Sequence, residues 1–147
     1  MNNMEYFEIL FGALLGFSFT LLIQLINWLI KKWKANKLLK LEFPEIQKFL
    51  ISYTTAYEME FYGISNTPIP YFELISNPNE ILYLDETKRV LVYKMNTNIK
   101  AAENLRLLAI PLINNPEREV ELNLYGKIYN DYLKAAKDDG EKLKKKI

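Results

Sequence analysis

The chain has 147 residues and contains neither cysteine nor histidine. It therefore excludes disulfides and thiolate chemistry, and it lacks the commonest general base and metal ligand. The net charge of +1 hides a segregation: residues 31–40 carry five lysines, residues 41–141 carry 10 basic and 16 acidic side chains, and residues 142–146 carry four lysines. An acidic body with only three scattered arginines argues against nucleic acid as a partner. The lysine-rich, arginine-poor composition is typical of an AT-rich bacterial or phage genome.

Residues 9–30 are 22 consecutive residues without a charge. A helix of that length rises about 33 Å, which is enough to cross the hydrocarbon core of a bilayer. Residues 1–8 contain two glutamates and no basic residue, and the apolar run is too long for a cleaved signal peptide. An interfacial helix would need a charged face, so a buried core helix is the remaining alternative. We predict a transmembrane helix over 9–30.

The charges that flank this run predict its orientation. Five lysines follow it within ten residues and none precedes it, so residues 1–8 are expected outside the cytoplasmic (inner) membrane and the rest of the chain in the cytoplasm. The lipid bilayer is thus an expected partner. The residues expected at the membrane surface are Trp28, Lys31, Lys32, Trp33, Lys34 and Lys37.

One side of the apolar run is small or polar. Gly12, Gly16, Thr20, Gln24 and Asn27 fall within an arc of about 120° on a helix, and we call them the polar face. Small residues allow close helix contact, and amides form hydrogen bonds across helix interfaces, so the polar face predicts a homo-oligomer. A chance glycine pair is the alternative. A pore lined by the polar face is a further alternative, although uncharged amides provide weak selectivity.

Three further segments follow the span. Residues 31–43 are expected to form a lysine-rich linker helix, and Pro44 suits the first turn of a new helix over 44–61. Residues 63–70 contain glycine and two prolines and predict a loop. The apolar side of the helix over 44–61 is expected to comprise Ile46, Phe49, Leu50, Tyr53 and Tyr57.

A short helix over 78–84 and a long helix from Asp85 to about Ile113 are predicted next, with Pro111 ending or kinking the latter. Residues 81–95 are also rich in β-formers, so a β-hairpin is the alternative there. Asn98 lies on the expected apolar seam of the long helix. Either it is buried there and fixes the register of helix packing, or the seam is rotated and Asn98 lies at its edge. The seam of the long helix is expected to contain Leu91, Met95, Asn98, Ala102 and Leu105.

Asn115 followed by Pro116 indicates the start of the last helix, which is expected to end near Lys137 because residues 138–140 read as a terminator. Residues 138–147 would then be a basic tail that either solubilises the chain or binds lipid. The apolar stripe of this helix is expected to be Val120, Leu124, Ile128, Tyr132 and Ala135.

The predicted fold is all-α: one transmembrane helix, then a small cytoplasmic bundle over 44–137 made of an antiparallel helix hairpin and one packing helix. No nucleophile elbow, phosphate loop or metal-ligand motif occurs, so we predict no catalytic residue, metal or cofactor. A membrane-anchored scaffold that recruits an unknown cytoplasmic protein or reads a small-molecule signal is the expected function. The alternative is an oligomeric effector that permeabilises the bilayer on receiving a signal.

Overall fold

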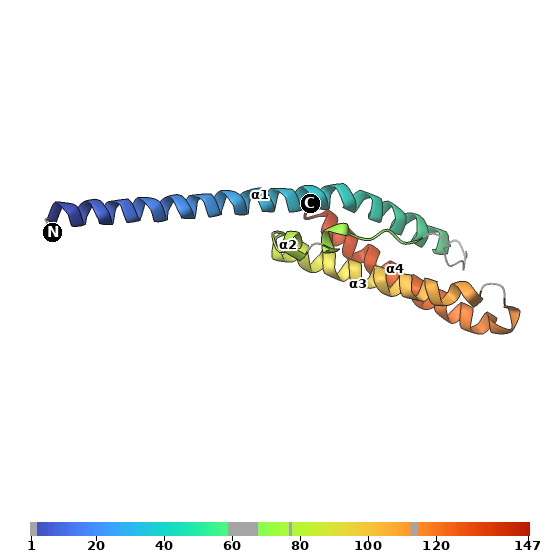
Figure 1. Cartoon of the computed structure of the whole chain (residues 1–147). Coiled ribbons are helices and arrows are strands. Elements are labelled where there is room, and N and C mark those ends of the chain that lie inside the picture. Colours follow the sequence, from blue (N-terminus) through green and yellow to red (C-terminus); the bar gives the residue numbers. More distant parts are fainter. Residues whose placement is uncertain (1–2, 59–67, 77, 113–114) are drawn as a thin grey trace.

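The computed structural model describes residues 3–58, 68–76, 78–112 and 115–147, and the chain is an all-α helical bundle with one long N-terminal helix (Figure 1). The described residues contain no strand, so the β-hairpin alternative for residues 81–95 is wrong. The long helix predicted there is confirmed from Glu86 onward, whereas the short helix predicted over 78–84 ends at Ile81 and residues 82–85 form a turn. In order, the elements are α1 (Asn3–Glu58), η1 (Glu73–Ser76), α2 (Pro78–Ile81), α3 (Glu86–Ala109), η2 (Ile110–Leu112), η3 (Pro116–Arg118) and α4 (Glu119–Lys144).

Helix α1 has two different halves. Its side chains are exposed, where described, from the N-terminus to Ile30, and this half projects alone from the molecule (Figure 1). From Ala35 onward one face is buried at spacings of four and three. This alternation is the period of a helix that packs against a bundle. The buried residues of this face are Ala35, Leu39, Phe43, Ile46 and Leu50.

The predicted break at Pro44 is wrong, because α1 continues through this residue as one helix of 56 residues. Proline removes one backbone hydrogen bond and normally kinks or ends a helix. Here Pro44 is exposed, while Phe43 and Ile46 on either side are 5% and 2% exposed. Their burial holds the helix together across the proline. Residues 31–43, predicted as a linker, are helical but belong to the packed body, since Ala35, Leu39 and Phe43 are in its core. Residues 59–67, which include the predicted helix end and most of the predicted loop, lie outside the described residues.

Helices α3 and α4 form the predicted antiparallel hairpin and lie side by side along their length (Figure 1). Leu91, Met95 and Ala102 of the predicted seam are buried, and Leu105 is half-buried. Asn98 is also half-buried, as the rotated seam predicts, and Asn96 is the buried asparagine of α3. As expected from Pro111, α3 ends at Ala109 and a 3-10 turn follows. Asn115 caps the next turn, because its side-chain oxygen accepts a hydrogen bond from the Glu117 amide at 3.2 Å.

The buried side of α4 is rotated by one residue from the predicted stripe. Tyr129, Leu133 and Ala136 are fully buried. By contrast, Val120 is 83% and Leu124 is 56% exposed. The predicted stripe is therefore wrong in phase. Its other members are half-buried or exposed: Ile128, Tyr132 and Ala135.

The predicted end of α4 is wrong as well, because the helix continues to Lys144. A Cβ atom on Gly140 would lie 3.2 Å from Met95 Cε and 3.9 Å from a Phe43 ring atom. The glycine therefore lets α4 pass close to α1 and α3, and it does not terminate the helix. Leu143 is buried and Ile147 packs against the core, so most of the predicted basic tail is part of the folded body.

Candidate functional site

The polar face of α1 is exposed along its whole length. Beyond the neighbouring backbone of α1 itself, no atom lies within 4 Å of the position that a Cβ would occupy on Gly12 or Gly16. The Thr20 hydroxyl donates to the Gly16 carbonyl oxygen at 2.9 Å, so this polar group is satisfied within its own helix. Within the described part of the chain, the Gln24 and Asn27 amides form no side-chain hydrogen bond. The amides are therefore the groups on this face that still need partners.

Among the described residues, one helix is long and apolar enough to cross a membrane, and it is α1. Its most apolar window of 18 residues has a mean hydropathy of 2.3, and none of these residues is buried in the fold. Large apolar side chains that pack on nothing are more favourably placed where water is excluded, as in a bilayer. This part of α1 can therefore span a membrane.

Aromatic and basic side chains pair at the point where the apolar run ends. Lys32 Nζ lies 5.1 Å from the centre of the Trp28 ring, and Lys37 Nζ lies 5.0 Å from the centre of the Trp33 ring. Both tryptophans are exposed. Paired indoles and ammonium groups are the usual anchors at headgroup level. Lys31 and Lys34 are exposed beside them, so the predicted membrane-surface residues form one continuous region.

A second site, missed by the sequence analysis, is an ion pair inside the bundle. Arg106 is 5% exposed, and its guanidinium donates to the Glu103 carboxylate at 2.8 Å from Nε and 2.6 Å from Nη2. The hydrogen bonds from Arg106 hold the pKa of the Glu103 carboxyl below its usual value. The same carboxylate accepts from the Ile69 amide at 3.3 Å. This pair therefore fixes the chain after residue 67 to α3. The signal was present in the sequence, since Arg106 lies on the buried stripe with Ala102 and Ala109.

Further polar groups are buried in the bundle. The Asn130 amide donates to the Gly126 carbonyl oxygen at 2.7 Å, and the Tyr129 ring meets the Tyr53 ring edge-on at 5.5 Å between centres. The side-chain oxygens of Asn96 and Asn130 accept no hydrogen bond from the described residues. Burial raises the pKa of Tyr129.

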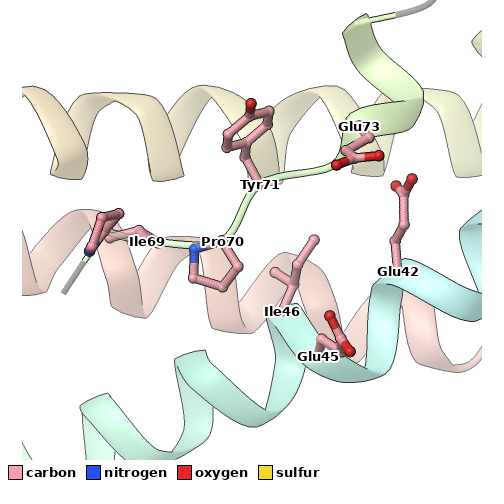
Figure 2. A pocket seen from close by; sticks show the side chains of 8 residues that line it. Glu42, Glu45, Ile46, Ile69, Pro70, Tyr71 and Glu73 are labelled. Atoms are coloured by element: carbon pink, nitrogen blue, oxygen red, sulfur yellow. The ribbon is translucent and has the colours of Figure 1, made fainter.

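An acidic hollow of about 360 Å³ lies between α1 and the segment over 68–73 (Figure 2). Figure 2 shows the carboxylates of Glu42 and Glu73 facing one another, with Glu45 on the next turn of α1. Glu42 accepts a hydrogen bond from the Leu74 amide at 3.3 Å. Burial, and then the nearby charges of Glu73 and Glu80, raise the pKa of Glu42. No group of side chains suited to hold a metal ion occurs in the described ranges.

Glu42→Gln is expected to raise the melting temperature by a few degrees at pH 7.5 and to leave it unchanged near pH 4. The pKa of Glu42 is raised in the folded state, so folding favours the protonated acid and the folded protein loses stability as pH rises through that pKa. Glutamine removes this loss and still accepts from the Leu74 amide. Thermal unfolding in detergent at the two pH values measures the effect. The matched control is Glu45→Gln, at an exposed position in the same hollow. An equal gain in both variants at pH 7.5 would contradict the explanation.

The predicted site residues therefore lie in three separate regions of the structure. The polar face is exposed on the projecting half of α1, the lysines and tryptophans lie at its end, and the seam is inside the hairpin. Comparison with known proteins finds no matching family model, no matching curated protein and no matching solved structure.

Proposed function

We propose that this chain is a single-pass membrane protein that self-associates through the polar face of α1 and presents its helical bundle as a non-enzymatic recruitment module. The observation that carries the proposal is the unsatisfied polar face: two glycines open to close approach, and the amides of Gln24 and Asn27 without partners in the described chain. Hydrocarbon offers an amide no hydrogen bond, and an unsatisfied amide there is unfavourable by about 2–7 kcal/mol. A second copy of the same face satisfies both amides.

The proposed orientation places the N-terminus outside the inner membrane of a bacterial cell and the bundle in the cytoplasm. Five lysines follow the apolar run and none precedes it. Basic residues next to a span remain on the cytoplasmic side. An anionic inner leaflet adds an attraction of about 1 kcal/mol for each lysine close to its surface.

Recruitment is supported by exposed apolar side chains at the tip of the hairpin, the end of the bundle farthest from the projecting half of α1 (Figure 1). Several large apolar residues at one end of a small domain are typical of a surface that binds another protein. Self-association would present several such tips together and increase avidity for a cytoplasmic partner or signal. The exposed residues at the tip are Leu107, Leu108, Ile110, Val120 and Leu124.

Gly16→Leu is expected to weaken self-association about tenfold, since a helix contact of this kind is worth roughly 1–2 kcal/mol. The added side chain would hold two backbones apart at the closest point of the polar face. Native mass measurement and crosslinking of the full chain in detergent provide the readout. Ser18→Leu is the matched control, because Ser18 lies on the opposite side and its hydroxyl already donates to the Leu14 carbonyl oxygen at 2.8 Å. The proposal fails if Gly16→Leu leaves the oligomer mass unchanged.

The unpaired amides also favour a second function, an oligomeric effector that permeabilises the bilayer. In that arrangement, several copies would turn Thr20, Gln24 and Asn27 toward a common polar path. Depolarisation of cells that express the chain, read with a potential-sensitive dye, separates the two functions. Depolarisation that disappears in the double variant Gln24→Leu and Asn27→Leu supports the effector. Accumulation without depolarisation supports the recruitment module.

A further inference from the structure

We propose that the bundle itself contacts the bilayer, through the turn that joins α2 to α3. We define the α2–α3 corner as residues 79–85, and we assign Leu82 and Tyr83 as its lipid-contacting side chains. The partner is the headgroup layer of the membrane that α1 crosses. The inference rests on the membrane span proposed above and adds a surface that the sequence analysis did not identify.

The position of the corner carries the argument. Lys31 Nζ lies 5.3 Å from the centre of the Tyr83 ring, and Lys32 Nζ lies 3.0 Å from Asp85 Oδ1. Both lysines directly follow Ile30, the last residue of the apolar run. Along α1 they lie within about 3 Å of the end of that run, since a helix rises 1.5 Å per residue.

The headgroup layer on each side of a bilayer is roughly 5–8 Å thick. A turn held at the level of Lys31 and Lys32 therefore lies within it. Figure 1 shows α2 at the end of the bundle nearest the projecting half of α1.

Several contacts fix the corner at this level. Asp85 is paired with Lys32 and also lies 3.8 Å from Lys88 Nζ, and Lys88 donates to the Asn36 side-chain oxygen at 2.8 Å. These contacts tie the start of α3 to the turn of α1 that follows the apolar run. They also offset the charge of Asp85 with two lysines, which reduces its repulsion from an anionic surface.

The chemistry of the corner suits a lipid interface. Leu82 is 60% exposed, and the half-buried Tyr83 presents an aromatic ring beside a lysine. Aromatic rings with a polar end are enriched at headgroup level. A hollow of about 250 Å³ next to them is lined by Lys31, Lys34, Asn79, Glu80 and Tyr83, which leaves room for a headgroup phosphate beside two ammonium groups.

Exposure of a leucine does not by itself indicate lipid contact, and the other end of the bundle shows this. Leu107 is 54% exposed, but it lies about 33 Å along α3 from the corner. Leu82 differs from Leu107 because the corner that contains it lies beside Lys31 and Lys32, at the end of the apolar run. The lysines around it also favour an anionic surface over a second copy of the same basic region.

The chain contains no cysteine, so single probes can be placed cleanly at Leu82→Cys and, as the matched control, at Leu107→Cys. Each full-length variant would carry a fluorescent label. It would be reconstituted in vesicles of phosphatidylcholine and phosphatidylglycerol that contain lipids brominated near the headgroup. We expect quenching several-fold stronger at position 82 than at position 107. Equal quenching at the two positions would overturn the inference.

The native fluorescence of Trp28 and Trp33 in the same vesicles tests the span separately. Quenched tryptophans with an unquenched probe at position 82 would overturn lipid contact by the corner and leave the membrane span standing. If neither the tryptophans nor the probe is quenched, the span itself is wrong. Circular dichroism of the two variants checks that both retain the helical fold.

Discussion

Arg106→Met should lower the free energy of unfolding by about 2–4 kcal/mol, because it leaves the Glu103 carboxylate without its partner inside the bundle. The Arg106 side chain is 7% exposed and that of Glu103 is 26% exposed, so water compensates the lost ion pair only in part. Methionine retains most of the apolar contact of the arginine stem. Urea unfolding of the full chain in a mild detergent, followed by circular dichroism, measures the loss.

Arg118→Met is the matched control for this prediction. Arg118 pairs with Glu121 at the same spacing along the chain, with a distance of 3.1 Å, but both side chains are about half exposed. Exposed pairs contribute about 0–1 kcal/mol, so this variant should unfold almost as the unchanged chain does. Equal losses in the two variants would show that burial does not strengthen the Glu103–Arg106 pair.

Arg106→Met also has a predicted pH dependence of stability. The pKa of Glu103 is lowered in the folded state, chiefly by Arg106. A lowered pKa contributes stability that is present above the usual glutamate pKa and is lost as pH falls through the folded value. Arg106→Met should therefore lose less stability than the unchanged chain between pH 7 and the acid range. Unfolding measured at both ends of that range would show the two stability curves converging.

Tyr129→Ala should destabilise the bundle by about 3–5 kcal/mol, the usual effect of removing a buried aromatic ring. Tyr129 is fully buried in α4, and its ring contacts that of Tyr53 from α1. Tyr132→Ala, three residues later in the same helix, should cost less than about 1 kcal/mol, because Tyr132 is 37% exposed. Urea unfolding compares the two variants directly. A larger effect at Tyr132 would restore the stripe that the sequence predicted and contradict the packing described here.

The comparison between Tyr129 and Tyr132 also shows why part of the fold escaped sequence reasoning. Apolar residues occur in adjacent pairs along α4: Ile128 with Tyr129, Tyr132 with Leu133, and Ala135 with Ala136. Both members of each pair fit a helical period, so two stripes one residue apart are equally regular. Contact with α3 and α1 selects one of them. In α3, packing against the other helices likewise decides that Asn96 is buried and that Asn98 is only half-buried.

Pro44 and Gly140 are of residue types that usually end helices, but neither ends its helix, because the effect of each depends on the side chains packed around it. Pro44 is exposed within α1 and is flanked by buried side chains, and Gly140 faces Met95 and Phe43 where α4 needs a residue without a side chain. A rule based on residue type alone considers the hydrogen bond that proline removes and the backbone entropy that glycine loses on folding. It does not count the burial of neighbouring residues, which in both helices is the larger effect.

The sequence by itself determined the helical class, the apolar run over 9–30, the lysines that follow it and the polar face. These features depend on the length, charge and angular spacing of residues close together in the chain. Only the tertiary structure decided which stripe each soluble helix buries, that Arg106 pairs inside the bundle, and that the α2–α3 corner meets Lys31 and Lys32. Each of those outcomes depends on contacts between residues far apart in the chain, and the shape of the partner helix selects among local patterns of similar energy.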